Sequence, residues 1–183
     1  MELFFATSNR GKFREARAVL PSDVKLRMAN IEIQEAQSCS TSEVARIKLE
    51  EAYAKLGLPV IVEDTGLSLD ALGGFPGALI KPMVERIGLE GIIKITSAYA
   101  SANASVSTSL GFTDGKHTRI ITSKIYGRIS DEPCGRNGFG FDSIFIPRGY
   151  SKTFAEMGIE EKNKNSARGM CFRKLSAYLS RLD

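Results

Sequence analysis

The stretch from Val60 to Gly77, VIVEDTGLSLDALGGFPG, constrains the fold and the chemistry of this chain more than any other. Its β-branched start, Val60 to Val62, predicts a buried strand that ends at two adjacent carboxylates, Glu63 and Asp64. Neighbouring side chains on a strand point to opposite faces, so the two carboxylates cannot serve the same purpose. Open α/β sheets bind ligands in the crevice beyond their strand ends, which would place one carboxylate in a site. A solvated strand end followed by an acidic loop is the alternative interpretation.

Length and composition are those of an ordinary globular chain. The 183 residues are 43% hydrophobic and 25% charged, enough for a sizeable core in one large domain or two closely packed lobes. There is no repeat or linker, so we expect a single domain over residues 1–183. No apolar run approaches a membrane span, and Met1 leads directly into a strand, so we expect neither a membrane segment nor a signal peptide. The net charge of +4 permits an acidic partner without naming one.

The cysteine and histidine content narrows the chemistry. Cys39, Cys134 and Cys171 are odd in number and widely spaced, which argues against a disulfide framework or a zinc site. We therefore expect a reducing, cytoplasmic setting. His117 is the only histidine, which disfavours a catalytic triad or a histidine-rich metal centre. Any metal would be held by oxygen ligands, which suits Mg²⁺ or Mn²⁺.

A polar turn near the N-terminus is a candidate phosphate site. A buried strand over Glu2–Ala6 leads into Thr7-Ser8-Asn9-Arg10-Gly11-Lys12, and the apolar spacing of the next segment predicts a helix over Phe13–Leu20. A helix start offers free backbone N–H groups and a positive dipole end, and Lys12 can reach a phosphate. A capped helix with a solvated lysine is an equally good explanation of this segment alone.

Further segments alternate between strand and helix patterns. Half-exposed strands are predicted over Val24–Met28 and Ile31–Glu35, followed by a helix that a capping box at Ser40 opens and Gly57 ends. The other expected elements are helices over 81–87 and 89–99 separated by Gly88, strands over 104–112 and 118–129 joined at Asp114-Gly115, a loop over 150–161 with a capped turn at Thr153, and a last helix from near Asn165 or Ser166. We expect His117, beside the hairpin turn, to be exposed.

Two later segments carry candidate site residues. The loop Gly138-Phe139-Gly140-Phe141-Asp142 precedes a predicted strand over 143–146. Aromatic rings between glycines can stack on a base, although a core-facing aromatic pair is the commoner outcome. From Lys162 to Lys174 the chain has five basic residues and no acidic one. Such a run is usually a solvated helix face, and a local positive field for phosphates is the sharper alternative.

Together and in this order, four segments resemble the inosine triphosphate pyrophosphatase family, hydrolases of non-standard purine nucleoside triphosphates. They are TSNRGK at 7–12, EDTGL at 63–67 with ALGGFPG at 71–77, GFGFD at 138–142, and FAEM at 154–157 with EKN at 161–163. The resemblance implies an α/β fold, in which an elongated mixed β-sheet with flanking helices forms two lobes around a central nucleotide cleft, usually in a homodimer. It also implies attack of water on the α-phosphorus to give a monophosphate and pyrophosphate, with Mg²⁺, or Mn²⁺ in its place, as cofactor.

The resemblance also assigns roles to residues. Asp64 matches the catalytic carboxylate, which orients or deprotonates the water and helps to hold the metal, and Glu35 is the best second metal ligand. The phosphates would be held by Thr7, Asn9 and Lys12, in a turn that includes Ser8, Arg10 and Gly11, and by Lys48, Thr65 and Lys162. The base pocket would be formed by Phe139, Gly140, Phe141 and Asp142, with Phe139 stacking and Arg168 contacting the six-position oxygen of the purine. The amino group of adenine would leave such a donor unpaired, which favours oxo-purines.

One departure from the family pattern leaves specificity open. The family has Ser-His-Arg where this chain has Ser166-Ala167-Arg168, so a base contact is missing, and Phe141 stands where a larger or more polar aromatic is common. Three other hypotheses are a nucleotide-binding protein with lost hydrolysis or broadened specificity, a nucleic-acid-binding protein that uses the basic run, and a sugar-nucleotide or pyrimidine triphosphatase of similar fold. Carboxylates repel a phosphate backbone, so we expect no nucleic-acid partner.

Overall fold

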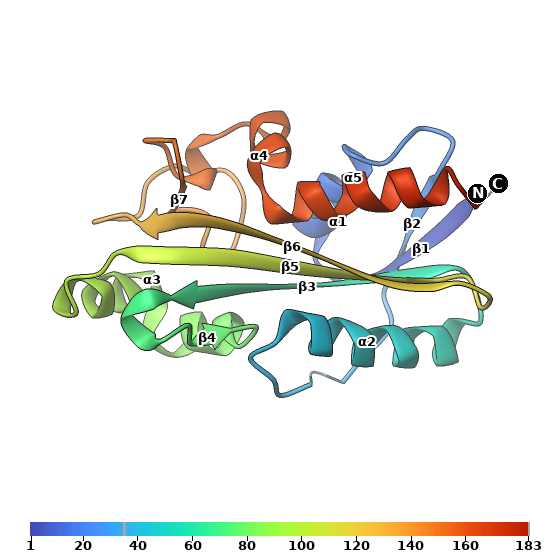
Figure 1. Ribbon diagram of the computed structural model, residues 1–183, viewed down its shortest axis with the longest axis horizontal. Coiled ribbons are helices and arrows are strands. Elements are labelled where there is room, and N and C mark those ends of the chain that lie inside the picture. The colour runs from blue at the N-terminus through green and yellow to red at the C-terminus, as the bar shows by residue number, and fades with distance from the viewer. Residues whose placement is uncertain (35, 183) are drawn as a thin grey trace.

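A computed structural model describes residues 1–34 and 36–182 of the chain (Figure 1). The elements in chain order are β1 (Glu2–Ala6), α1 (Arg10–Arg17), β2 (Lys25–Ala29), α2 (Thr41–Leu56), β3 (Val60–Leu69), the 3₁₀ turn η1 (Asp70–Leu72), β4 (Pro76–Gly77), α3 (Ile80–Ala98), β5 (Asn103–Thr113), β6 (Thr118–Ile129), β7 (Phe145–Pro147), the 3₁₀ turn η2 (Phe154–Glu156), α4 (Ile159–Asn165) and α5 (Ala167–Leu179). No helix in the described ranges is both long and apolar enough to cross a membrane.

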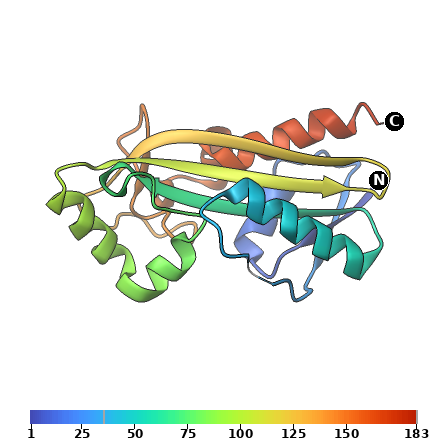
Figure 2. The ribbon, with the colours of Figure 1, turned by 60° about the horizontal axis from the view of Figure 1, so that its bottom comes forward.

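The strands form one seven-stranded mixed sheet in the order β2-β1-β3-β5-β6-β7, with β4 paired to β3 off this path. Strand β1 is parallel to β2 and β3, and the other pairings are antiparallel. The long β3, β5 and β6 give the molecule its elongated shape, with α5 on one side and α2 and α3 on the other (Figures 1 and 2). The predicted α/β class with an elongated mixed sheet is confirmed.

The two faces of β3 pack against different helices. Ile61 belongs to the apolar cluster that joins β1, α1 and α5, whereas Val60 and Val62 belong to the cluster that joins the sheet to α2. A third cluster lies around α3, with Leu67, Ile92 and the ends of the long strands. Because side chains alternate along a strand, Glu63 continues the face of Ile61 and the following residue continues the face of Val62.

The prediction that a short strand ends at the carboxylates is wrong. Strand β3 runs on to Leu69 and pairs with β5 along its whole length, from Val60 opposite Thr113 to Leu69 opposite Ala104. Its backbone groups are therefore satisfied well past Glu63, and the two carboxylates lie within the sheet. Gly66 permits the close approach of β4, since a Cβ there would lie 2.5 Å from the carbonyl carbon of Gly77.

Other differences have local causes. Helix α1 begins at Arg10, before the predicted Phe13, because the Asn9 side chain accepts hydrogen bonds from the next turn. No strand forms over 31–34, where Ile31 and Ile33 alternate because they pack against the α2 cluster, and Glu35 lies outside the described residues. The loop expected over 150–161 gives way to α4 from Ile159, and β7 lies slightly later than predicted.

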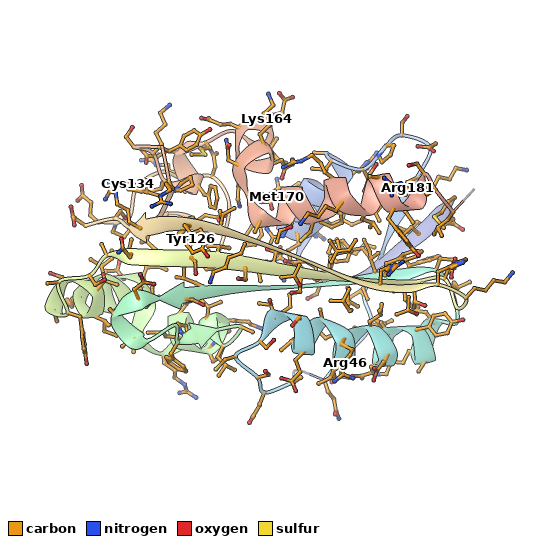
Figure 3. The ribbon with its side chains drawn as sticks, in the orientation of Figure 1. Arg46, Tyr126, Cys134, Lys164, Met170 and Arg181 are labelled. Atoms are coloured by element: carbon orange, nitrogen blue, oxygen red, sulfur yellow. The ribbon has the colours of Figure 1, made fainter. Side chains whose placement is uncertain are left out.

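Several local signals are confirmed. Ser40 caps α2, and Gly57 ends it in the left-handed conformation with φ of 61°. Gly88, with φ of 70°, interrupts α3 where two helices were expected. The hairpin between β5 and β6, the capping box at Thr153 and the start of α5 after Ser166 also match the predictions. His117 is exposed, as expected. Figure 3 shows the side chains on this frame, with Arg46 on the outer side of α2.

Candidate functional site

A cavity of about 820 Å³ brings together segments that are far apart in the sequence. Its wall is built from the turn between β1 and α1, from α2, β3 and β5, from the start of α3, and from the loop, α4 and α5 near the C-terminus. The predicted site residues on this wall are Thr7, Ser8, Asn9, Lys12, Lys48, Thr65, Phe139, Gly140, Phe141, Asp142, Lys162 and Arg168. Arg10, Gly11 and Asp64 are not among the lining residues.

The turn between β1 and α1 is held by its own side chains. The Asn9 Oδ1 atom accepts hydrogen bonds from the backbone N–H groups of Gly11, at 2.8 Å, and Lys12, at 3.0 Å. Thr7 Oγ1 accepts one from the Asn9 N–H at 3.1 Å. These backbone donors, expected to be free for phosphate, are therefore already used. What the turn presents to the cavity is a set of hydroxyl and amide side chains and the Lys12 ammonium group.

Six side chains of alternating charge form a buried ion chain along one side of the cavity. Lys12 Nζ lies 2.8 Å from Glu63 Oε2, and Glu63 Oε1 lies 3.3 Å from Arg168 Nη2. The second terminal nitrogen, Arg168 Nη1, donates to Glu15 Oε2 at 2.5 Å. Lys162 Nζ donates to Glu15 Oε1 at 2.7 Å and to Asp142 Oδ2 at 2.5 Å. The buried ion chain thus consists of Lys12, Glu63, Arg168, Glu15, Lys162 and Asp142.

Burial and neighbouring charges shift the pKa values of three members of the buried ion chain. Burial alone would raise the pKa of Glu63, but the charges of Arg168 and Lys12 lower it to about 2. The pKa of Asp142 is raised by burial, which the charge of Lys162 only partly offsets. The pKa of Arg168 is raised, because Glu63 and Glu15 outweigh the effect of its burial. Glu63 and Arg168 are therefore firmly charged.

Asp64 faces the other side of β3, toward α2. Its Oδ1 atom accepts a hydrogen bond from Lys48 Nζ at 3.1 Å, and Lys48 does line the cavity. Its Oδ2 atom is buried without a hydrogen-bond partner among the described residues. Burial raises the pKa of Asp64, opposed by the charges of Lys48 and Lys12. A buried carboxylate oxygen without a partner is costly unless something binds it.

That oxygen is suited to a hard cation. Mg²⁺ takes one or two carboxylates and completes its shell with water and substrate phosphate oxygens. No cluster of three or more histidine, cysteine or acidic side chains capable of holding a metal occurs in the ranges that the structure describes. The second predicted ligand, Glu35, lies outside those ranges. Asp64 fits a metal that one or two carboxylates and the substrate hold together.

The aromatic loop lies directly on the ion chain. Asp142 Oδ2 accepts a hydrogen bond from the Phe139 N–H at 2.7 Å, which fixes the loop. The Phe139 ring has Lys162 Nζ at 4.8 Å and the guanidinium carbon of Arg168 at 5.2 Å from its centre. It also lies against the first turn of α1, where a Cβ on Gly11 would come within 2.4 Å of a ring carbon.

Sequence reasoning missed Glu15 and the wall that α3 provides. Glu15 was hidden within a short helix, where the one available signal was its position three residues after Lys12, on the same helical face. On α3, Lys81 and Glu85 line the cavity beside Ile80 and Val84. The spacing of these residues predicted a helix, and no signal in it marked them as site residues.

Comparisons with known proteins show the family of this chain. A family model described as the Ham1 family matches residues 3–178. The chain belongs to the Ham1 family. It is 38% identical over 180 residues to the dITP/XTP pyrophosphatase of Methanopyrus kandleri, covering 97% of this chain and 96% of that one. It is 37% identical to the inosine triphosphate pyrophosphatase of Kluyveromyces lactis, covering 97% and 95%.

Solved structures place the chain in the same Ham1 family. A HAM1 protein from Coxiella burnetii superposes with a TM-score of 0.86 at 26% identity, over 99% of both chains. The Ham1 protein of Staphylococcus aureus gives 0.84 at 25% identity over the full length of both. The family resemblance inferred from the four segments is confirmed. Membership is consistent with a divalent-metal-dependent hydrolase.

Proposed function

We propose that this Ham1 protein is a nucleoside triphosphate pyrophosphatase. It hydrolyses the non-canonical purine nucleotides ITP, dITP and XTP to the monophosphate and pyrophosphate, and so removes them from the nucleotide pool. The names of its relatives support the reaction class and the substrates. The observation that carries the proposal is the buried Asp64 Oδ2 atom without a partner, beside a cavity that also presents Lys12, Lys48 and an aromatic base loop.

The triphosphate end of the site uses charge and orientation. A nucleoside triphosphate carries about four negative charges, which cations must neutralise before a nucleophile can approach. Lys12 and Lys48 supply two of the neutralising positive charges, from opposite sides of β3. Asp64 orients or deprotonates the attacking water and, with Glu35, holds the metal. The metal is Mg²⁺, with Mn²⁺ as a substitute, and when bound it supplies further charge neutralisation at the phosphates.

The base end of the site uses stacking and a single donor. Phe139 offers its ring to the purine. Both terminal nitrogens of Arg168 already donate to carboxylates, and its Nε–H is buried with no partner in the described part of the chain. This N–H is a donor for the six-position oxygen of the base, and adenine would leave it unpaired. Ala167, fully buried on the cavity wall, supplies no polar contact of its own.

The remaining assignments concern the setting of the enzyme. The continuous sheet supports a single domain over residues 1–183 with no separable linker. The family resemblance supports a homodimer. The three cysteines are free and scattered, which supports a cytoplasmic location.

A second candidate is a nucleotide-binding protein of the same fold with broadened specificity or lost hydrolysis. Ala167 favours it, because the family histidine contact to the base is missing. This protein would bind the nucleotides with little preference for the oxo-purines, or would release no pyrophosphate from them.

A panel of triphosphates separates these functions. Purified protein with Mg²⁺ is incubated with ITP, XTP, ATP, GTP, CTP and UTP, and pyrophosphate and orthophosphate are scored separately. We expect pyrophosphate from ITP and XTP, near-complete loss in Asp64→Asn, and full activity in the exposed control Asp131→Asn. Orthophosphate as the sole product would refute the mechanism, and binding without either product would establish the second candidate.

Ala167→His is expected to raise the ratio of ITP to ATP hydrolysis; an unchanged ratio would show that position 167 does not set specificity.

A further inference from the structure

Glu15 is a buried carboxylate to which the proposed reaction assigns no role. Its side chain is 5% exposed, and it is not among the residues that line the cavity. Each of its two carboxylate oxygens accepts from a different cation, Oε1 from Lys162 and Oε2 from Arg168. Its backbone carbonyl also accepts a hydrogen bond from the Asn163 side chain at 3.2 Å. Glu15 therefore acts on the site through other residues.

These contacts connect distant parts of the chain. Glu15 lies on α1, while its partners lie on α4 and α5, 147 and 153 residues later. Both partners line the cavity and both approach the ring of Phe139. The position of Glu15 therefore fixes three groups at the base end of the cavity: an ammonium, a guanidinium and an aromatic ring.

Charge explains why an acid is needed at this point. Lys162 and Arg168 are 4% and 6% exposed and lie side by side against one ring. Two buried cations this close repel each other unless a shared anion lies between them. Asp142 and Glu63 neutralise their outer sides, and Glu15 is the anion in the middle. Replacing it with a neutral residue leaves the ion chain with one cation in excess.

The contacts of Glu15 also set the orientation of the Arg168 guanidinium group. A guanidinium group is a rigid planar fork, so two bound terminal nitrogens set the direction of the third N–H. Glu15 holds Nη1 of Arg168, while Glu63 and Thr65 contact Nη2 at 3.3 Å. With both ends held, the Nε–H has one direction available, and it is the donor that remains without a partner in the described ranges.

We propose that Glu15 is a positioning residue for base recognition, which holds Arg168 and Lys162 against Phe139 before the nucleotide enters. This inference rests on the proposed function in that the cavity takes a purine nucleotide. Glu15 reaches neither the phosphates nor the metal-binding oxygen of Asp64. Its loss therefore weakens binding and base selectivity, while the chemical step at saturating substrate is largely preserved.

The kinetic test compares Glu15→Gln with the matched control Glu50→Gln, an exposed glutamate on α2 paired with Arg46. We expect Glu15→Gln to raise the KM for ITP about tenfold or more, as for loss of charge-assisted hydrogen bonds, with kcat within about threefold of wild type. The ratio of ITP to ATP hydrolysis is expected to fall with it. A purely structural salt bridge would instead lower the melting temperature and leave KM and the ratio unchanged in the folded variant, which would overturn the proposal.

A second measurement needs no activity. The Arg168 Nε–H is expected to give a resolved, slowly exchanging proton resonance in the NMR spectrum of the wild-type protein. It should be lost or broadened in Glu15→Gln and kept in Glu50→Gln; a resonance unchanged by Glu15→Gln would overturn the positioning role. If wild-type protein releases no pyrophosphate from ITP, the proposed function fails, while this resonance still decides the role of Glu15. If Glu15→Gln does not fold, Glu15→Asp decides, because the shorter acid cannot hold both cations: a raised KM supports the proposal and an unchanged KM refutes it.

Discussion

Replacing Glu63 with glutamine tests the buried ion chain most severely. The Glu63 side chain is fully buried and contacts Lys12 at 2.8 Å and Arg168 at 3.3 Å. Removal of one member of a buried pair leaves an uncompensated charge and costs about 3–5 kcal/mol. The pKa leads to a similar figure, because a drop from 4.5 to about 2, at about 1.4 kcal/mol per unit, corresponds to about 3 kcal/mol. We therefore expect Glu63→Gln to lose about 3–5 kcal/mol of unfolding free energy.

Urea denaturation at neutral pH measures this loss, and the midpoint of thermal unfolding should fall by roughly 6–20 °C, since 1 kcal/mol shifts the midpoint by about 2–4 °C in a chain of this size. The control is Glu50→Gln, whose side chain is 68% exposed and pairs with Arg46 at 3.1 Å. An exposed pair of this kind contributes less than about 1 kcal/mol. A loss in Glu63→Gln no larger than in the control would refute the view that the buried ion chain is a coupled network.

Two further predictions concern titratable groups outside the site. The pKa of Asp114 is lowered from 3.8 to about 2 by hydrogen bonds from the backbone and side chain of His117, so its contribution to stability is full above pH 3.8 and is lost as the pH falls toward 2. An NMR titration of the carboxyl carbon should show this low midpoint, and a midpoint at or above 3.8 would contradict it. Burial raises the pKa of Cys171 to about 11, so in native protein at neutral pH we expect iodoacetamide to modify the exposed Cys39 and not Cys171. Alkylation of Cys171 at a rate close to that of Cys39 would contradict this expectation.

Local signals predicted the elements that local chemistry determines. The capping serine and terminal glycine of α2, Ser40 and Gly57, directly flank the helix they delimit, and Asp114-Gly115 is a turn signal on its own. The length of β3 could not be predicted in this way, because its continuation past Glu63 depends on pairing with β5, about 40 residues later. Two adjacent carboxylates indicate a solvated strand end when the sequence does not show which cations neutralise them. In the structure, Lys12 pairs with Glu63 and Lys48 pairs with Asp64.

The residues of the site also divide into those that local motifs predicted and those that they could not. The motifs identified the turn at Lys12, the carboxylates of β3 and the loop at Phe139. The structure brings Lys12, Glu63 and Phe139 to the wall of one cavity, and it places Asp64 in contact with Lys48 on that wall. Glu15 could not be recognised as a site residue, since its partners lie 147 and 153 residues later and no motif beside it indicates them. The pairing of Lys162 with two carboxylates could not be predicted either, because the segment from Lys162 to Lys174 contains only basic charges.

Hydrolysis of ITP in water labelled with heavy oxygen tests the proposed reaction most directly. Asp64-assisted attack on the α-phosphorus places the oxygen of the water in the nucleoside monophosphate. Mass spectrometry of the products is therefore expected to find the label in inosine monophosphate and none in pyrophosphate, with both products absent for Asp64→Asn. Label in pyrophosphate or in orthophosphate would show attack at the β- or γ-phosphorus and would contradict the proposed mechanism.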